Sequence, residues 1–321
     1  MSDPSGLELI TIGRVGVDLY PEQIGVTLAR VRSFAKSLGG SPTNVAVAAA
    51  RLGHRSAVIT KVGSDGFGAY VREALAEFGV DARYVGTDPT LRTPVVFCEI
   101  HPPDHFPLLF YREPKAPDLN IEASELDLDA IARVPILWTC GTALSQEPSR
   151  AATLAALRAA RGTTIHDLDH RPMFWGSSGD ARAQAVDALR HARVVVGNLD
   201  EVEMATGTRE ADRAAEALLA LGPTLAIVKR GPQGTLARTK TERVELPPVP
   251  TVVLNGLGAG DAFGGALCHG LLSRWDLGRT IAFANAAGAL VASRLACADA
   301  MPTVAEVDAM LARDTAAKVR A

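Results

Sequence analysis

Short runs of β-branched and aliphatic residues alternate with longer runs rich in alanine and leucine along most of the chain. The short runs predict buried strands, because they are apolar and too short for helices. They are Leu9–Ile12, Ala57–Lys61, Ile136–Thr139, Thr164–Leu168, Val194–Val196 and Leu225–Val228. The longer runs between them predict helices, namely Thr43–Leu52, Gly68–Phe78, Ser149–Arg161, Ala181–Leu189 and Ala211–Leu221. This alternation indicates an α/β fold, in which helices cover both faces of a mostly parallel sheet.

Two segments, Val15–Lys36 and Thr93–Arg112, interrupt the alternation. Both contain alternating apolar and polar stretches without a helix between them, and a turn-rich stretch, His101–His105, divides the second. We expect these segments to form extra strands that leave the main sheet and build a small β-flap.

The rest of the chain adds no further domain. Beyond Asp261 it is predicted to be helical almost to its end, over Ala262–Leu272, Gly278–Leu295 and Val304–Val319. No internal repeat and no low-complexity linker is visible. We therefore expect a single domain over residues 1–321, with a discontinuous lid from about 14–37 and 92–113.

Composition narrows the class of partner. Of the 321 residues 47% are hydrophobic, and the net charge is −3 without any block of like charges, so neither nucleic acid nor a membrane surface is an expected partner. Four cysteines lie far apart without a CxxC spacing, and seven histidines show no HExxH spacing, so we expect no metal held by protein ligands. We expect a cytoplasmic protein that binds small molecules.

The stretch Leu254-Asn-Gly-Leu-Gly-Ala-Gly-Asp261 carries the clearest chemical signal. Thr251–Leu254 predicts a short strand and the run from Ala262 predicts a helix, with a glycine turn between them. Such a turn directs several backbone N–H groups and the positive end of the helix dipole to one place, where an anion can bind. A carboxylate at that place requires an explanation.

Four explanations compete for Asp261. A dinucleotide-binding domain is disfavoured, because helix follows helix where a second strand is needed, and a Walker A loop is excluded because no Gly-Lys pair occurs. Asp261 could simply cap the helix. In phosphoryl transfer, the N–H groups of Gly258, Ala259 and Gly260 would hold phosphate oxygens, and Asp261 would take the proton from the attacking hydroxyl.

Two motifs together resemble the signatures of the ribokinase-like carbohydrate kinases, or PfkB family. They are Gly39-Gly-Ser-Pro-Thr-Asn44, followed by Val45–Gly53, and Leu254–Phe263. The resemblance spans nearly the whole chain in order. It implies ATP-dependent phosphorylation of a sugar hydroxyl, a flap that closes over the sugar, and Mg²⁺ held mainly through phosphates and water; a monovalent cation is left open. A sensor that binds sugar or nucleotide without turnover is the alternative outside enzymes.

The resemblance also assigns residues to the two substrates. It implies that Asp18, Gly40 and Asn44 contact the sugar; Asn44 could instead be a residue of a helix N-terminus, an alternative that the double glycine before it weakens. It implies a nucleotide site that includes Asn198 and Glu201 of an NxxE motif. A strand-end loop and a helix supply the rest of that site: Lys229, Gly231, Gly234 and Asn285. A capped helix at Asn198, a solvated Lys229 and a helix-packing Asn285 remain alternatives.

The sequence departs from the family pattern at the positions two and three before Gly258-Ala-Gly-Asp261. Many family members have Asp-Thr there, whereas this chain has Asn255 and Gly256, so their role stays open. A homodimer through the lid is a further expectation, because a flap leaves strand edges unpaired.

Two arginines bear on the substrate. Arg112 ends the second flap segment, and Arg171 follows a strand by three residues, at the sheet edge where α/β proteins bind ligands. Both resemble positions that acid-sugar kinases of the family use for the substrate carboxylate, so we expect a dehydro-deoxy sugar acid, with neutral sugars as the alternative. Instead, Arg171 could pair with Asp167 or Asp169, and Arg112 with Glu113.

Overall fold

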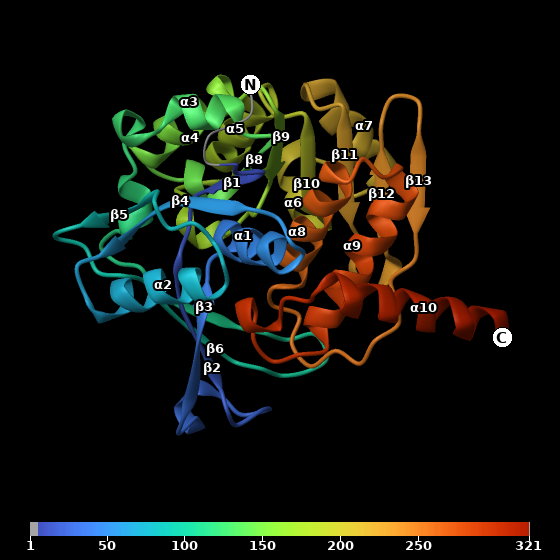
Figure 1. The fold of residues 1–321 in the computed structure, drawn as a ribbon, viewed down its shortest axis with the longest axis horizontal. Helices are drawn as coiled ribbons and strands as arrows, with labels where there is room; N and C mark the ends of the chain where they lie inside the picture. The colour runs from blue at the N-terminus through green and yellow to red at the C-terminus, as the bar shows by residue number, and fades with distance from the viewer. Residues whose placement is uncertain (1–5, 321) are drawn as a thin grey trace.

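The computed structural model describes the backbone of residues 6–320 and the side chains of residues 6–315 (Figure 1). Its main sheet has nine strands in the order β13-β12-β11-β10-β9-β8-β1-β4-β5. Seven strands are parallel: β1 (Leu9–Ile12), β4 (Ser56–Gly63), β5 (Val85–Asp88), β8 (Ile136–Cys140), β9 (Thr163–Asp167), β10 (Val194–Asn198) and β11 (Leu225–Lys229). The hairpin β12 (Thr235–Arg238) and β13 (Arg243–Leu246) adds an antiparallel edge.

Helices pack on both faces of this sheet through separate apolar cores. One face carries α1 (Ser41–Arg51), α2 (Gly66–Glu77), α8 (Ala259–Leu272) and α9 (Leu277–Ala292). The other face carries α3 (Leu128–Arg133), α4 (Ser149–Ala159), α5 (Ser178–Leu189), α6 (Leu199–Thr206) and α7 (Ala211–Leu221). The last helix, α10 (Val304–Arg320), packs on α9. The predicted α/β fold with a mostly parallel sheet is confirmed.

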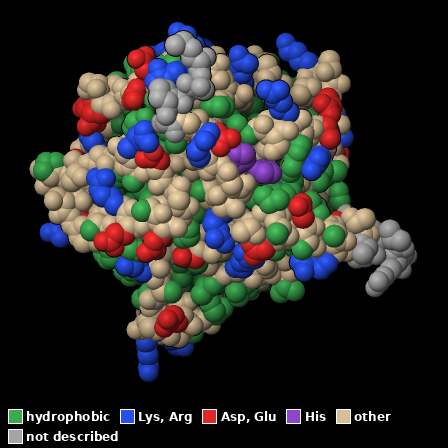
Figure 2. All heavy atoms as spheres, viewed as in Figure 1, with side chains coloured by type: hydrophobic (Ala, Val, Ile, Leu, Met, Phe, Trp, Pro, Cys, Tyr) green, Lys and Arg blue, Asp and Glu red, His purple; other side chains and the backbone are tan. Residues whose placement is uncertain are grey.

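A second sheet of four strands forms the lid, which projects below the main body in Figure 1. Its order is β3-β2-β6-β7, with β2 (Gly16–Pro21), β3 (Phe34–Gly39), β6 (Val95–Cys98) and β7 (Leu108–Tyr111). Both interrupting segments of the sequence therefore supply the extra strands that were expected of them. Charges of both signs are scattered over the face shown in Figure 2, and apolar side chains gather where the lid joins the body.

Three contacts fasten the lid to the C-terminal part of the chain. Tyr20 of β2 donates a hydrogen bond to the Cys297 thiol (2.7 Å), and Ser37 of β3 donates to Asp299 (2.5 Å). At the tip of the lid the Phe106 ring faces Gly256, where an added Cβ would lie 3.0 Å from the ring. The position of the lid is thus coupled both to the segment before α8 and to the segment after α9.

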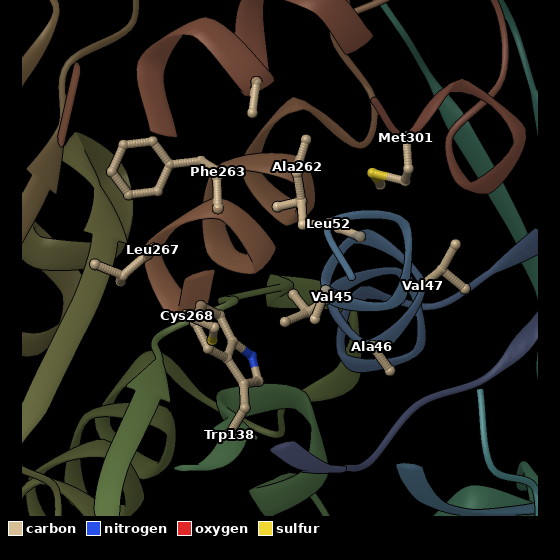
Figure 3. Close-up of a cluster of buried hydrophobic side chains, with 14 of the residues drawn as sticks. Val45, Ala46, Val47, Leu52, Trp138, Ala262, Phe263, Leu267, Cys268 and Met301 are labelled. Atoms are coloured by element: carbon tan, nitrogen blue, oxygen red, sulfur yellow. The ribbon is translucent and has the colours of Figure 1, made fainter. Parts of the chain in front are cut away.

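Helices α1 and α8 cross closely above Trp138 of β8 (Figure 3). A Cβ at Gly265 would lie 2.3 Å from the Ala48 Cβ, and one at Gly264 would lie 2.7 Å from the Trp138 ring. Larger side chains at either position would push the helices apart. The crossing brings the first turns of α1 and α8 together, and these turns carry the residues of the candidate site.

One predicted strand is wrong. Thr251–Leu254 is not a strand, because the N–H groups of Leu254 and Asn255 both donate to the Ala292 carbonyl at the end of α9. The same contact accompanies an earlier end of α9, at Ala292 instead of the predicted Leu295. The last strand before this segment is β13, which forms the outer edge of the sheet.

None of the helices in the described part of the chain combines the length and the apolar character that a bilayer span requires.

Candidate active site

The carboxyl ends of the central strands, the lid and the first turn of α8 enclose a cavity of about 790 Å³. This volume lies in the range of small-molecule sites. All the residues that the sequence assigned to a site line it, with the exception of Arg112. The cavity lies where parallel α/β sheets place their ligands, beyond the carboxyl ends of the strands.

Asp261 lies in the first turn of α8, and its carboxylate is held from α1. Ser41 Oγ donates to Oδ1 (2.7 Å) and Asn44 Nδ2 donates to Oδ2 (2.9 Å). Asp261 does not cap its helix, since Gly258 occupies the N-cap without a side-chain bond, so the simple capping explanation is wrong. Burial raises the pKa of Asp261 to about 6, against the lowering effect of Asn44 and Ser41. A buried carboxylate of that pKa, oriented by two donors, is suited to accept a proton near neutral pH.

The glycines around Asp261 differ in what surrounds them. Gly258 has φ 81°, and a Cβ there would lie 2.6 Å from the Cys297 sulfur, so the turn requires glycine for packing. A Cβ at Gly260 would meet only the Lys229 ammonium within 4 Å, at 3.2 Å. The start of α8 is therefore open toward the cavity and faces a cation, as an anion site at a helix N-terminus requires.

Acidic groups surround the cation at the end of β11. Lys229 Nζ lies 3.5 Å from the Asp167 carboxylate. Burial alone would lower the pKa of Lys229, but the charges of Asp167 and Glu201 outweigh it and raise this pKa. Burial raises the pKa of Glu201 to about 7, so this carboxyl group changes charge near neutral pH.

The NxxE motif makes a capping box at the start of α6. Asn198 Oδ1 accepts from the Glu201 N–H (3.0 Å), and the Asn198 N–H donates to Glu201 Oε2 (2.7 Å). Glu201 Oε1 lies 3.5 Å from Arg171. The capped helix that the sequence left as an alternative is present, and both residues also line the cavity.

The predicted sugar-binding residues lie between α1 and the lid. Gly40 has φ 103°, and a Cβ there would lie 2.3 Å from the Arg14 carbonyl oxygen, so only glycine fits. Asn44 gives its amide to Asp261, while its Oδ1 is buried without a hydrogen-bond partner among the described residues. Burial raises the pKa of Asp18, on β2, to about 6. Polar groups with unused capacity thus face the sugar side of the cavity.

The far end of the cavity lies between β12 and α9. Asn285 Oδ1 accepts from Thr235 Oγ1 (2.7 Å), and its amide donates to the Pro247 carbonyl (3.2 Å). The predicted helix-packing role of Asn285 is therefore real, although the residue also lines the cavity. Gly234 has φ 82°, and a Cβ there would lie 2.0 Å from the Leu246 oxygen, so the hairpin itself needs this glycine. Gly231, with φ 56°, has no such neighbour within 4 Å.

The structure places Arg112 outside the predicted site. Its guanidinium donates to both carboxylate oxygens of Asp118 (2.5 and 3.1 Å), and the Asp118 side chain is 1% exposed. Asp118 also accepts from the Val15 N–H (3.1 Å). The pair fixes the base of the lid, and Arg112 is absent from the cavity wall. Neither contact with a substrate nor a surface pair with Glu113 is supported.

Sequence analysis missed several residues of the site, among them Ser41, which donates to Asp261, and Arg14. Arg14 follows β1, lines the cavity and contacts Asp169, whose carboxylate also forms an ion pair with Arg171 (3.0 Å). The available signal was its place in Gly13-Arg-Val-Gly-Val-Asp18, directly behind a strand of the main sheet.

Asn255 has a structural explanation. Its amide donates to the Leu295 carbonyl (2.5 Å), and its Oδ1 accepts from the Leu257 N–H (3.0 Å), which makes an Asx turn just before Gly258. Among the described residues, no group of three or more His, Cys, Asp or Glu side chains is arranged to hold a metal ion.

Comparison with known proteins identifies the family. The sequence profile of the pfkB family carbohydrate kinases matches residues 7–304. The chain belongs to this family. It is therefore a carbohydrate kinase, and the cavity described above is the candidate active site of a pfkB family member.

Curated relatives match over most of the chain. A 5-dehydro-2-deoxygluconokinase from Geobacillus kaustophilus is 32% identical over 94% of this chain and 92% of its own. One from Listeria monocytogenes is 32% identical over 95% of this chain and 96% of its own.

Solved structures of the pfkB family agree in fold. A fructokinase from Xylella fastidiosa with bound ATP is 25% identical, with a TM-score of 0.85 over 96% of this chain and 99% of its own. A fructokinase from Vibrio cholerae O395, solved with fructose, ADP and calcium ion, is 28% identical, with a TM-score of 0.84 over 95% of this chain and 99% of its own.

Proposed function

We propose that this kinase transfers a phosphoryl group from ATP to 5-dehydro-2-deoxy-D-gluconate, forming the 6-phosphate in myo-inositol catabolism. The observation that carries the kinase chemistry is the Asp261 carboxylate, held by Ser41 and Asn44 at the open start of α8. The substrate assignment is supported by relatives of this name, which are 30–32% identical over at least 94% of the chain.

Asp261 acts as the general base. Its carboxylate accepts the proton of the substrate hydroxyl as that oxygen attacks phosphorus, and Ser41 and Asn44 keep the carboxylate oriented during transfer. Backbone N–H groups of Gly258, Ala259, Gly260 and Asp261 stabilise the negative charge that develops on the phosphoryl oxygens. Asp18, Gly40 and Asn44 position the sugar, and the lid above them excludes water that would compete with it.

The residues present fit ATP with Mg²⁺. When bound, ATP supplies the phosphoryl group and Mg²⁺ neutralises charge on its phosphates. The open helix start at Gly260 leaves room for phosphate, and Lys229 offers a cation 3.2 Å from the position of the missing Cβ. Glu201 and Asn198 would orient the hydrated metal, and Gly231, Gly234 and Asn285 would line the nucleotide site. The homodimer through the lid stays a prediction.

The kcat/KM of the enzyme should fall about tenfold per pH unit as the pH drops below about 6, because Asp261 must be ionised to accept a proton. The measurement is a pH–rate profile with saturating ATP. Unfolding linked to Asp261 does not cause this loss: its folded pKa lies above the unfolded value near 3.8, so protonation between these values favours the folded state.

Asp18 requires a separate pH–rate experiment, because burial also raises its pKa to about 6. Asp18→Asn should keep the acid limb, whereas the residual activity of Asp261→Asn should lose it. If the acid limb persists in Asp261→Asn and disappears in Asp18→Asn, the loss of activity at low pH comes from Asp18, and the prediction for Asp261 is wrong.

A panel of acceptors tests the substrate. ADP release should be fastest with 5-dehydro-2-deoxygluconate, slower with 2-dehydro-3-deoxygluconate, and at least about tenfold slower in kcat/KM with ribose or fructose, because a charged contact to the carboxylate is lost. A preference for ribose or fructose would refute the acid-sugar assignment and leave the kinase assignment standing. Absence of ADP release with every acceptor would favour a sensor.

A further inference from the structure

Three neighbouring strands of the main sheet end around one carboxylate. Asp169 lies two residues after β9, Arg14 lies two residues after β1, and Thr142 follows β8, which runs between them. Thr142 Oγ1 donates to Asp169 Oδ2 (2.8 Å), and Arg14 Nη2 approaches the same oxygen at 3.2 Å. Arg171 Nη2 lies 3.0 Å from Oδ1 of this carboxylate. Asp169 therefore holds two guanidinium groups at the cavity wall.

We propose that Arg14, together with Arg171, binds the carboxylate of the sugar substrate and so determines the preference for an acid; this rests on the proposed function. Asp169 orients both guanidinium groups and does not itself contact the substrate.

The two arginines have few direct partners at this corner of the cavity, although the carboxylates of Asp18 and Asp261 also act on Arg14 through space. One carboxylate faces two arginines, and the further partner of Arg171, Glu201, lies 3.5 Å away with a pKa that burial raises to about 7. A substrate carboxylate at contact distance would give the two guanidinium groups a second direct partner. Guanidinium groups suit this role because their planar donors match the two oxygens of a carboxylate.

Arg14 also has unused hydrogen-bonding capacity. Arg14 is 9% exposed, and its buried Nε has no hydrogen-bond partner in the part of the chain that the structure describes. The bonds of its guanidinium to Asp169 come from Nη2 alone. A buried donor without a partner lowers stability unless a ligand satisfies it, so this group indicates a binding role.

The location of Arg14 is on the sugar side of the cavity. Its carbonyl accepts from Thr43 Oγ1 (3.0 Å) and packs against Gly40, at the start of the helix that also carries Asn44. Its guanidinium lies 6.0 Å from the centre of the Phe110 ring on the lid strand β7. A substrate between lid and sheet would meet Arg14 there. The strand β12, which Asn285 contacts, lies five strands away from β1 across the main sheet.

The backbone at Asp169 supports the same conclusion. Asp169 has φ 30°, one of two non-glycine residues with positive φ in the described chain. This conformation is strained for an L-residue and persists where the surroundings impose it, often at ligand sites. With this backbone conformation, the carboxylate lies between the two arginines. The Asp169 N–H donates to Asp167 Oδ1 (3.0 Å).

The test compares 5-dehydro-2-deoxygluconate with its carboxamide, which has the same shape without the charge. Wild-type enzyme should prefer the acid by at least about tenfold in kcat/KM. Arg14→Met should lower kcat/KM for the acid by at least about tenfold and for the carboxamide by less than about threefold, with the KM for ATP unchanged. Arg14→Lys keeps the charge without the fork and should retain part of the preference.

Arg112→Met is the matched control, because it also removes a buried arginine from an ion pair but lies outside the cavity. Its ratio of acid to carboxamide activity should equal that of the wild type. Thermal unfolding of each variant identifies any that fail to fold. If Arg14→Met does not fold, the ratio of acid to carboxamide activity is compared between Arg14→Lys and the wild type.

Two results would overturn the assignment in different ways. If the wild type prefers the acid but Arg14→Met weakens acid and carboxamide equally, Arg14 is only a structural partner of Asp169. If the wild type phosphorylates ribose or fructose and neither sugar acid, the proposed substrate class itself fails, and the role of Arg14 fails with it.

Discussion

Replacing Asp261 with asparagine should lower kcat by roughly two to four orders of magnitude, the usual contribution of a general base. Asparagine has the same shape and can still accept from Ser41 Oγ, but it cannot take a proton from the sugar hydroxyl. The KM for ATP should change little, because the backbone N–H groups of the first turn remain. Steady-state kinetics with a coupled ADP assay, together with thermal unfolding, make the measurement.

A matched control exists within the chain. Helix α5 begins Ser178-Gly179-Asp180, and helix α8 begins Ala259-Gly260-Asp261, so Asp180 occupies the same helical position away from the cavity. Asp180→Asn should leave kcat unchanged, and this comparison separates loss of a base from loss of an acidic residue in the first turn. A kcat for Asp261→Asn within about fivefold of the wild type would rule out general-base catalysis by this residue.

Gly260→Val should reduce kcat/KM for ATP by at least about a thousandfold, because the side chain would stand between the helix start and the phosphates. The structure predicts that the protein still folds. A Cβ at Gly260 meets only the flexible end of Lys229, and the backbone there is helical. The measurement is kcat/KM, with the rise in melting temperature on adding ADP as a readout of binding that does not depend on turnover.

Gly179→Val supplies the control for this change. Gly179 has the same position in α5 and meets only the Ser177 hydroxyl, at 3.7 Å from an added Cβ. Both valine variants should melt within a few degrees of the wild type, whereas only Gly260→Val should lose activity and the response to ADP. Retention of both properties in Gly260→Val would mean that phosphate does not bind at the start of α8.

The sequence predicted those parts of the site that depend on local chemistry. Gly258 to Asp261 could be located because a glycine turn before a helix has a defined physical use, and the structure opens this turn to the cavity. Asp18, Gly40 and Asn44 came from motif resemblance, and they line the same cavity. Positions fixed by a turn or a helix start need little knowledge of the rest of the fold.

The roles of the arginines could not be predicted from local sequence. Arg112 was assigned by its place at the end of a flap segment, but Asp118 lies close enough to take its charge, and a residue six positions away gives no local signal of that contact. Arg14 was overlooked because its burial results from three strand ends that come together only in the folded sheet. Pairing between charges depends on which groups are nearby and desolvated, and this is a tertiary property.

Thr251–Leu254 illustrates a different limit. The run of β-branched residues was a sound strand signal, but a strand needs a free neighbour in a sheet. Here the N–H groups of Leu254 and Asn255 donate to the Ala292 carbonyl at the end of α9 instead. Competition for hydrogen-bond partners decided the outcome.

The close crossing of α1 and α8 has a consequence for synthesis on the ribosome. Trp138 and Val45 are covered by Gly264 of α8, which emerges roughly 120 residues after Trp138. At translation rates of about 5–20 residues per second, the nascent chain exposes Trp138 for about 6 to 24 s before Gly264 emerges, and Val45 for longer. A helix from the last part of the chain therefore completes both the core and the catalytic base, so nascent chains that end before α8 should be inactive and should bind chaperones that recognise exposed aromatic and aliphatic side chains.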